Sequence, residues 1–133
     1  MVLPVAAQAA LPAVLTQAKP MFAVKPAVVG FTGDGTGYLG GAGGTIRRPG
    51  RLRWVRYSAR EGRARGGIYL NDCEPDCADG SFHRRAVRVR VFRPRHGRFT
   101  RMTIRYRYAG RKRVDRRALG GSGKYHYWGL ARR

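Results

Sequence analysis

Residues 86–93 read AVRVRVFR and residues 99–108 read FTRMTIRYRY, and these two segments decide the fold class. In both, apolar residues alternate with arginine or threonine, and a period of two is typical of a β-strand with one buried face. The four residues at 94–97, PRHG, contain proline and glycine and suit a turn. The pattern therefore predicts an antiparallel hairpin.

The register of this hairpin is expected to place Arg93 opposite Arg98. Val89 then lies against Met102, and the apolar side chains of both strands face the same side. The other face carries Arg88, Arg90, Arg101, Arg105 and Arg107. Because like charges directly opposite one another destabilise a sheet, that face requires solvent or an anionic partner.

The remainder of the chain also favours strands. Four further segments are rich in Val, Ile, Tyr, Phe and Trp and are bounded by glycine, proline or charged turns; they are 22–31, 52–58, 67–70 and 125–130. No segment keeps an apolar period of 3.6 residues, and 114–119, where a short helix could form, reads better as an exposed loop. A chain of 133 residues suffices for one domain. We predict an all-β domain, a small antiparallel β-sandwich or barrel.

A glycine-rich stretch at 33–44, GDGTGYLGGAGG, contains the spacing G-x-G-x-x-G at 35–40. In dinucleotide-binding proteins the last glycine of that spacing opens a helix whose N-terminus faces the pyrophosphate. Here Gly40 leads into GAGGTIRRPG, which does not favour a helix. The stretch is therefore interpreted as a Gly-rich loop between strands, anchored by Tyr38 and Leu39, and no cofactor is expected.

The first 18 residues, MVLPVAAQAALPAVLTQA, carry no charge, and the composition changes at Lys19-Pro20. Small residues at Thr16 and Ala18 match the positions that a signal peptidase reads, although a basic n-region is missing. Residues 1–18 are interpreted as a signal-peptide remnant or a disordered Ala/Pro-rich arm, and no transmembrane segment is expected. Residues 19–133 would then form the single β domain of a monomer that is secreted or held in the cell envelope.

Two cysteines, Cys73 and Cys77, lie in the segment NDCEPDCADG at 71–80, which also holds four of the seven acidic residues. In an oxidising compartment a close pair of cysteines is most simply a disulfide that closes a turn. Two metal hypotheses stay open beside it: a calcium loop, and a zinc site that uses both thiolates with a histidine. The weak candidate ligands are Asp72, Asp76, Asp79 and His83.

The charge balance is the strongest functional signal in the sequence. Lys and Arg total 28 against seven Asp and Glu, a formal net charge of +21. Such an excess attracts nucleic acid, anionic surfaces or acidic wall polymers. Stacking surfaces that would suit single-stranded nucleic acid are available from Tyr57, Tyr69, Tyr125, Tyr127 and Trp128.

Several phrases read together resemble a known group of proteins. They are FAVKPAVVGFTGDGTGYLGG, RLRW, IYLNDCEPDCADGSF, VRVFRPRHGRFTRMTIRYRY and the closing YHYWGL. Together they are similar to an uncharacterised family of small secreted proteins from high-GC actinobacteria. The resemblance covers about Met21 to Leu130 and implies secretion and a Cys-x-x-x-Cys pair. It implies no activity and no catalytic residues.

These observations predict an exported, strongly basic β domain that binds an anionic polymer or surface through its arginine-bearing hairpin. The anionic partner would be a cell-wall polymer or extracellular nucleic acid. Two alternatives remain: an intracellular nucleic-acid-binding protein and a small metal-dependent hydrolase. No pair or triad of residues identifies a catalytic site, so a non-enzymatic role is favoured.

Overall fold

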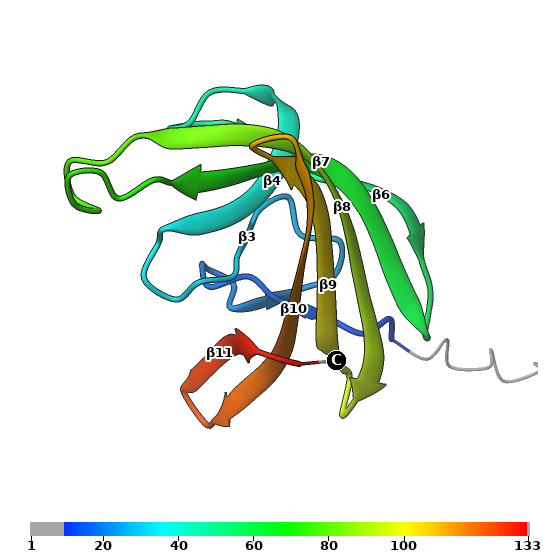
Figure 1. Cartoon of the computed structure of the whole chain (residues 1–133). Helices are drawn as coiled ribbons and strands as arrows, with labels where there is room; N and C mark the ends of the chain where they lie inside the picture. The colour runs from blue at the N-terminus through cyan, green and yellow to red at the C-terminus, as the bar shows by residue number, and fades with distance from the viewer. Residues whose placement is uncertain (1–9, 133) are drawn as a thin grey trace, which may run out of the picture.

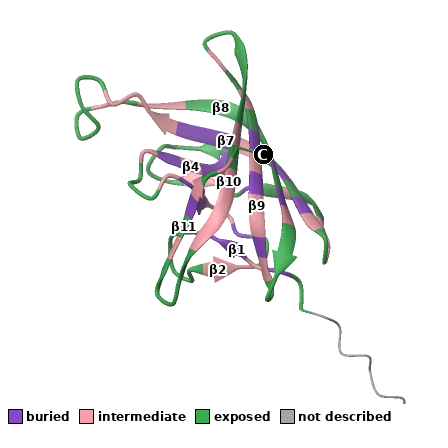
Figure 2. Ribbon diagram, turned by 60° about the horizontal axis from the view of Figure 1, so that its bottom comes forward, coloured by how far each residue is buried: buried purple, intermediate pink, exposed green. Residues whose placement is uncertain are grey.

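The computed structural model describes residues 10–132, and within that range the chain forms strands and no helix. Nine strands belong to one antiparallel sheet, which curls into a half-barrel around the N-terminal part of the chain (Figure 1). Buried residues lie on the inner side of this curl (Figure 2). The predicted all-β antiparallel fold is therefore confirmed, in the form of a half-barrel.

The strands follow one another across the sheet in chain order along most of its width. The long ones are β7 (Glu61–Asn71), β8 (Phe82–Arg95), β9 (Arg98–Tyr108) and β10 (Arg111–Ser122), and β11 (Tyr125–Leu130) forms one edge. On its other side β7 pairs first with β6 (Arg53–Tyr57) and then with β4 (Gly37–Gly44). The shorter strands are β3 (Val29–Gly30) and β5 (Pro49–Gly50), which pair with β4, and β1 (Val14–Leu15) and β2 (Phe22–Ala23), which pair with each other.

The predicted faces of the β8–β9 hairpin are correct, but its predicted register is wrong by two residues. Val89 lies opposite Ile104, and Arg95, rather than Arg93, lies opposite Arg98. The turn consists of His96 and Gly97, both with positive φ (51° and 75°). A two-residue turn with positive φ at both positions matches the right-handed twist of the flanking strands. The hairpin therefore closes with this turn instead of the expected four-residue loop, and the register shifts by two residues.

Strand β10 replaces the loop that was expected around 114–119. Its inward positions carry an ion pair instead of an apolar alternation: Arg117 donates to both carboxylate oxygens of Asp115, at 2.6 and 3.0 Å. These two residues lie opposite Met102 and Ile104 of β9, and their side chains are 14% and 19% exposed. Mutual neutralisation lets two charged residues occupy the inner face of the sheet.

The glycine-rich stretch is only partly a loop. Residues 33–36 form a turn, whereas Gly37–Gly44 is strand β4. Leu39 is buried in the core, and the ring of Tyr38 stacks on Tyr69 with centroids 4.7 Å apart, so the predicted anchors are confirmed. Glycines are needed here for close approach: a Cβ on Gly66, where β7 exchanges β6 for β4, would lie 2.1 Å from the carbonyl oxygen of Gly40.

Part of the segment expected to be a leader or arm packs into the core. Residues 1–9 lie outside the described residues, but Val14 and Leu15 are buried. The indole nitrogen of Trp128 donates to the carbonyl oxygen of Leu15 at 3.0 Å. The hydroxyl of Tyr57 donates to the carbonyl oxygen of Pro12 at 2.5 Å. Residues 12–15 therefore contact both β6 and β11 and belong to the core of the half-barrel.

Replacing Gly66 with alanine should strongly destabilise the protein. The added methyl group meets the Gly40 backbone, which cannot move aside without breaking the β4–β7 pairing, and overpacking of this kind costs about 1–3 kcal/mol or more. Gly43→Ala is the matched control because a Cβ there meets nothing within 4 Å. Thermal melts of the two variants should differ clearly, and equal melting temperatures would contradict the crossing geometry.

A chain that begins at Lys19 should be less stable than one that begins at Ala10. The longer deletion removes Val14 and Leu15 from the core, and burial of two such side chains contributes about 3 kcal/mol or more. Removal of residues 1–9 leaves every described contact in place. Denaturant titration of both truncated chains checks this; unchanged stability on loss of residues 10–18 would show that the core does not need them.

Candidate functional site

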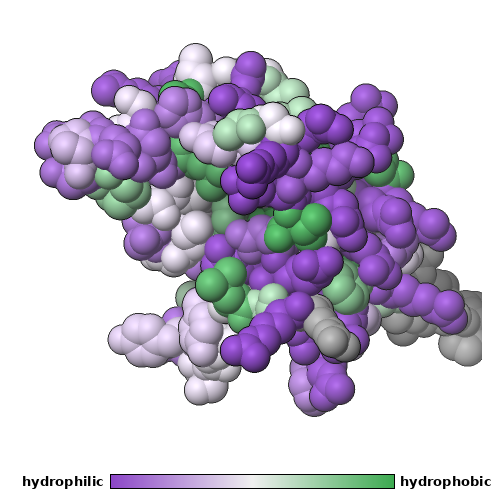
Figure 3. Space-filling model, in the orientation of Figure 1, coloured by the Kyte–Doolittle hydropathy of each residue, from purple (hydrophilic) through white to green (hydrophobic). Residues whose placement is uncertain are grey.

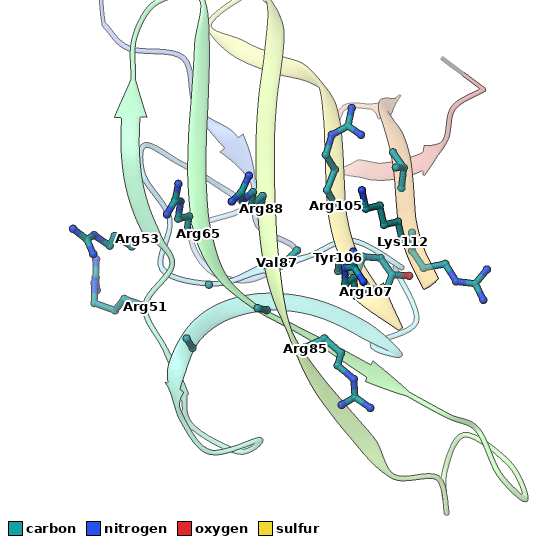
Figure 4. Close-up of a pocket in the computed structure, with 15 residues that line it drawn as sticks. Arg51, Arg53, Arg65, Arg85, Val87, Arg88, Arg105, Tyr106, Arg107 and Lys112 are labelled. Carbon is teal, nitrogen blue, oxygen red and sulfur yellow. The ribbon is translucent and has the colours of Figure 1, made fainter. Parts of the chain in front are cut away.

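Four arginines on four adjacent strands form a single cross-strand line, here called the arginine row. Arg53 of β6 lies opposite Arg65 of β7, Arg65 opposite Arg88 of β8, and Arg88 opposite Arg105 of β9. All four are exposed. Figure 4 shows them in this order across the neighbouring strands, with Arg53 pointing away from the others at one end. Neighbouring strands place such residues about 5 Å apart, so the row spans about 15 Å.

The alternation along each strand produces the row. Ala64, Val89 and Ile104 are buried against the core, and in strands their sequence neighbours must point to the opposite face. Arg65, Arg88 and Arg105 are the residues directly next to these three along the chain. The arginine row therefore lies on the outer face of the sheet, directly beside the buried residues Ala64, Val89 and Ile104.

A second line of arginines, Arg56, Arg63 and Arg90, runs beside the first and is partly neutralised. Glu61 accepts from the Nε atoms of Arg90 at 2.8 Å and of Arg63 at 3.0 Å, and the Nε of Arg56 lies 3.9 Å away. Hydrogen bonds from Arg90 and then Arg63 lower the pKa of Glu61, so the carboxylate stays ionised near neutral pH.

The arginine row has no such counter-charge. No carboxylate of residues 10–132 forms an ion pair with Arg53, Arg65, Arg88 or Arg105. Four adjacent guanidinium groups without a counter-charge repel one another, and only solvent or an anionic ligand relieves that repulsion.

The row lies between two hollows in the surface. The larger, of about 960 Å³, is lined by eight arginines, one lysine and no acidic residue of the described part of the chain (Figure 4). The smaller, of about 420 Å³, shares Arg65, Arg88 and Arg105 with it. The face of the molecule seen in Figure 3 is mostly hydrophilic, with small separate hydrophobic patches. Guanidinium groups bind phosphate and carboxylate oxygens through paired hydrogen bonds, so these hollows suit an anionic chain.

The five arginines predicted from the hairpin occupy one face of it, as expected. Arg88 and Arg105 belong to the arginine row, and Arg90 belongs to the neighbouring line that Glu61 holds. Arg107 lies opposite Lys112 and lines the larger hollow, whereas Arg101 is half-buried opposite Phe92. Their role in binding stays a prediction.

Sequence reasoning missed the half of the row that lies outside the hairpin. Arg65 belongs to the run GRARGG at 62–67, whose alternating partners are glycine and alanine and so give no apolar signal. Arg53 pairs with it from β6, inside the predicted strand 52–58, whose assignment rests on its apolar and aromatic residues. The period-two spacing of Arg63 and Arg65 was the available signal.

The acidic segment forms a disulfide-closed turn. Cys73 and Cys77 are bonded, which confirms the predicted pairing. Asn71 supports the turn from both sides: its Oδ1 accepts from the Cys73 amide at 2.9 Å, and its Nδ2 donates to the Cys77 carbonyl at 2.7 Å. Asp76 accepts from the Asp79 amide at 2.8 Å, so its carboxylate also serves the turn.

The predicted metal ligands do not converge. Asp72 and His83 meet at 3.0 Å, but the described residues contain no group of three His, Cys, Asp or Glu side chains that could hold a metal ion. Both cysteine sulfurs are in the disulfide and cannot act as thiolate ligands. The hydrogen bond with His83, followed by those from the Ser81 and Glu74 amides, lowers the pKa of Asp72 to about 2.

Three of the five aromatic residues predicted as stacking surfaces belong to the interior. Tyr69 and Trp128 are buried, and Tyr57 packs against the core, where burial raises its pKa to about 12. Tyr125 and Tyr127 are 84% and 53% exposed. Only these two are open to a ligand.

Comparison with family models, with curated proteins and with solved structures found no match to this chain. None of the described residues belongs to a helix with the length and apolar character needed to cross a membrane.

Proposed function

We propose that this protein binds an anionic polymer, without catalysing a reaction, through the arginine row and the two hollows beside it. The observation that carries the proposal is the row itself: four exposed arginines on adjacent strands with no ion-pair partner among the described residues. A linear polyanion presents repeated charges at similar spacing. It would relieve the repulsion along the row and fill the hollows at once.

Binding would proceed by charge neutralisation. Each arginine that pairs with a phosphate or carboxylate releases condensed counterions into solution, and the affinity then falls steeply with salt concentration. The net charge of +21 would accelerate the approach of any polyanion. This mechanism needs no cofactor and no conformational change.

Residence outside the cytoplasm or in the cell envelope is part of the same proposal. The resemblance to a family of small secreted proteins and the Cys73–Cys77 disulfide support it. A cell-wall polymer or extracellular nucleic acid would be the partner in that setting.

The salt dependence of binding tests the proposal directly. The full chain is titrated with poly(glycerol phosphate) and, separately, with a short oligothymidylate, at several salt concentrations. For both, the logarithm of affinity should fall linearly with the logarithm of salt. In the double variant Arg88→Gln/Arg105→Gln the slope should shrink by about 1.5, because two phosphate contacts are lost.

The matched control for that variant is Arg47→Gln/Arg48→Gln. It removes the same net charge from an exposed loop that lines neither hollow. If the control weakens binding as much as the variant in the arginine row, net charge rather than this surface is responsible. Binding that is insensitive to salt, or no binding to either polymer, would overturn the proposal.

Replacing Glu61 with glutamine should tighten binding. Glu61 holds Arg63 and Arg90, and its neutralisation would release both guanidinium groups for a ligand. At low salt we expect a gain of about threefold to tenfold, the size of one to two surface charge interactions. Asp79→Asn makes the same change in net charge within the disulfide turn and should have a smaller effect. The affinities of both variants for the same polymer are measured under identical conditions. An equal gain in affinity for the two variants would count against binding at the face that carries Arg63 and Arg90.

A further inference from the structure

The ring of Tyr127 packs against two glycines, Gly120 and Gly129. It faces Gly120 across the β10–β11 pair, and Gly129 follows two residues later in its own strand. A Cβ on Gly120 would fall 2.6 Å from the Cζ of Tyr127, 2.7 Å from Cε2 and 2.8 Å from the hydroxyl oxygen. A Cβ on Gly129 would fall 3.2 Å from Cε2. Any larger residue at Gly120 would displace the ring.

These distances show which side of the ring is covered. Cζ is bonded to both Cε2 and the hydroxyl oxygen, so a point beside the ring edge between those two atoms would be nearer to them than to Cζ. Here Cζ is the nearest of the three, which places Gly120 beneath the face of the ring. Tyr127 is nevertheless 53% exposed, so its other face is open to solvent.

The open ring face belongs to the same side of the sheet as the arginine row. Arg105 lies opposite Val114 of β10, and Gly120, opposite Tyr127, is six residues further along that strand. Because six is an even number, Gly120 lies on the same face of β10 as Val114. At 3.3 Å per residue these two residues are about 20 Å apart. Arg116 lies between them on this face and is exposed.

An aromatic face is a poor contact for a phosphate or carboxylate, because its quadrupole is negative. It is a good contact for a planar, neutral group such as a nucleobase. A duplex keeps its bases stacked inside, whereas a single strand can turn them outward. A simple polyol phosphate chain has no planar group to place on Tyr127.

We infer that the anionic polymer is a single-stranded nucleic acid, with a base stacked on Tyr127 and its phosphates leading along Arg116 to the arginine row. The inference rests on the proposed function and specifies its ligand. Tyr125, 84% exposed and on the same face as Tyr127 by alternation, lies next to it at the end of the hairpin. A second base can stack there.

The test compares an oligothymidylate with an abasic oligodeoxynucleotide of equal length. The full chain should bind the oligothymidylate about tenfold more tightly, because only that strand carries bases. Tyr127→Leu should reduce this difference to what stacking on Tyr125 alone provides, since leucine still covers the two glycines but has no planar face. Tyr127→Phe should keep it. Melting temperatures of both variants show whether the β10–β11 hairpin is intact.

The outcomes separate the two proposals. If Tyr127→Leu retains the tenfold preference with an intact fold, the ring serves only to cover the glycines and the inference is wrong, while the role of the arginine row stands. Equal affinity of the wild-type chain for the two strands, or for poly(glycerol phosphate), likewise overturns the inference in favour of a base-free polymer. If neither strand nor poly(glycerol phosphate) binds, the proposed function itself fails.

Discussion

Cross-strand contact between Ala64, Val89 and Ile104 is the interaction on which the rest of the protein depends. These three buried residues lie directly opposite one another on β7, β8 and β9. A slip of one residue between β7 and β8 would turn Val89 to solvent and Arg88 towards the core. Burying an unpaired guanidinium group costs several kcal/mol, so apolar burial and charge exposure enforce the same pairing. The arginine row is a direct consequence of this core.

The sequence predicts which residues lie on each face of the β8–β9 hairpin, but it does not predict which residues pair across it. A shift of two residues leaves every side chain on its face, so the pattern of β8 and β9 fits the expected register as well as the observed one. Turn geometry decides between them, through the positive φ angles of His96 and Gly97. Strand β10 was hidden for a different reason. Its inward residues Asp115 and Arg117 neutralise each other, and an ion pair leaves no apolar period to detect.

The candidate site was half visible for a related reason. Arg88 and Arg105 stand out because valine, isoleucine and tyrosine alternate with them. Arg65 alternates with alanine and glycine, since β7 is crowded where it exchanges one neighbouring strand for another. Small residues suit that crossing but weaken the strand signal. Arg53 and Arg65 join the row because β6 pairs with β7 and β7 pairs with β8. The pattern within one strand cannot specify which strands are neighbours in the sheet.

The positions of the acidic residues explain why the basic face stays uncompensated. Four of the seven lie in the segment at 71–80, where carboxylates of the disulfide turn bind backbone amides. Asp34 accepts hydrogen bonds from Thr36 within its own turn, and Asp115 is paired inside the half-barrel. Among the described residues this leaves Glu61, at the start of β7, as the acid that holds the outer arginines. This one carboxylate partly neutralises the line formed by Arg56, Arg63 and Arg90. Among the described residues, the arginine row has no acidic ion-pair partner. Its guanidinium groups stay available to an external anion because the other acidic residues lie in turns of their own or are paired inside the half-barrel.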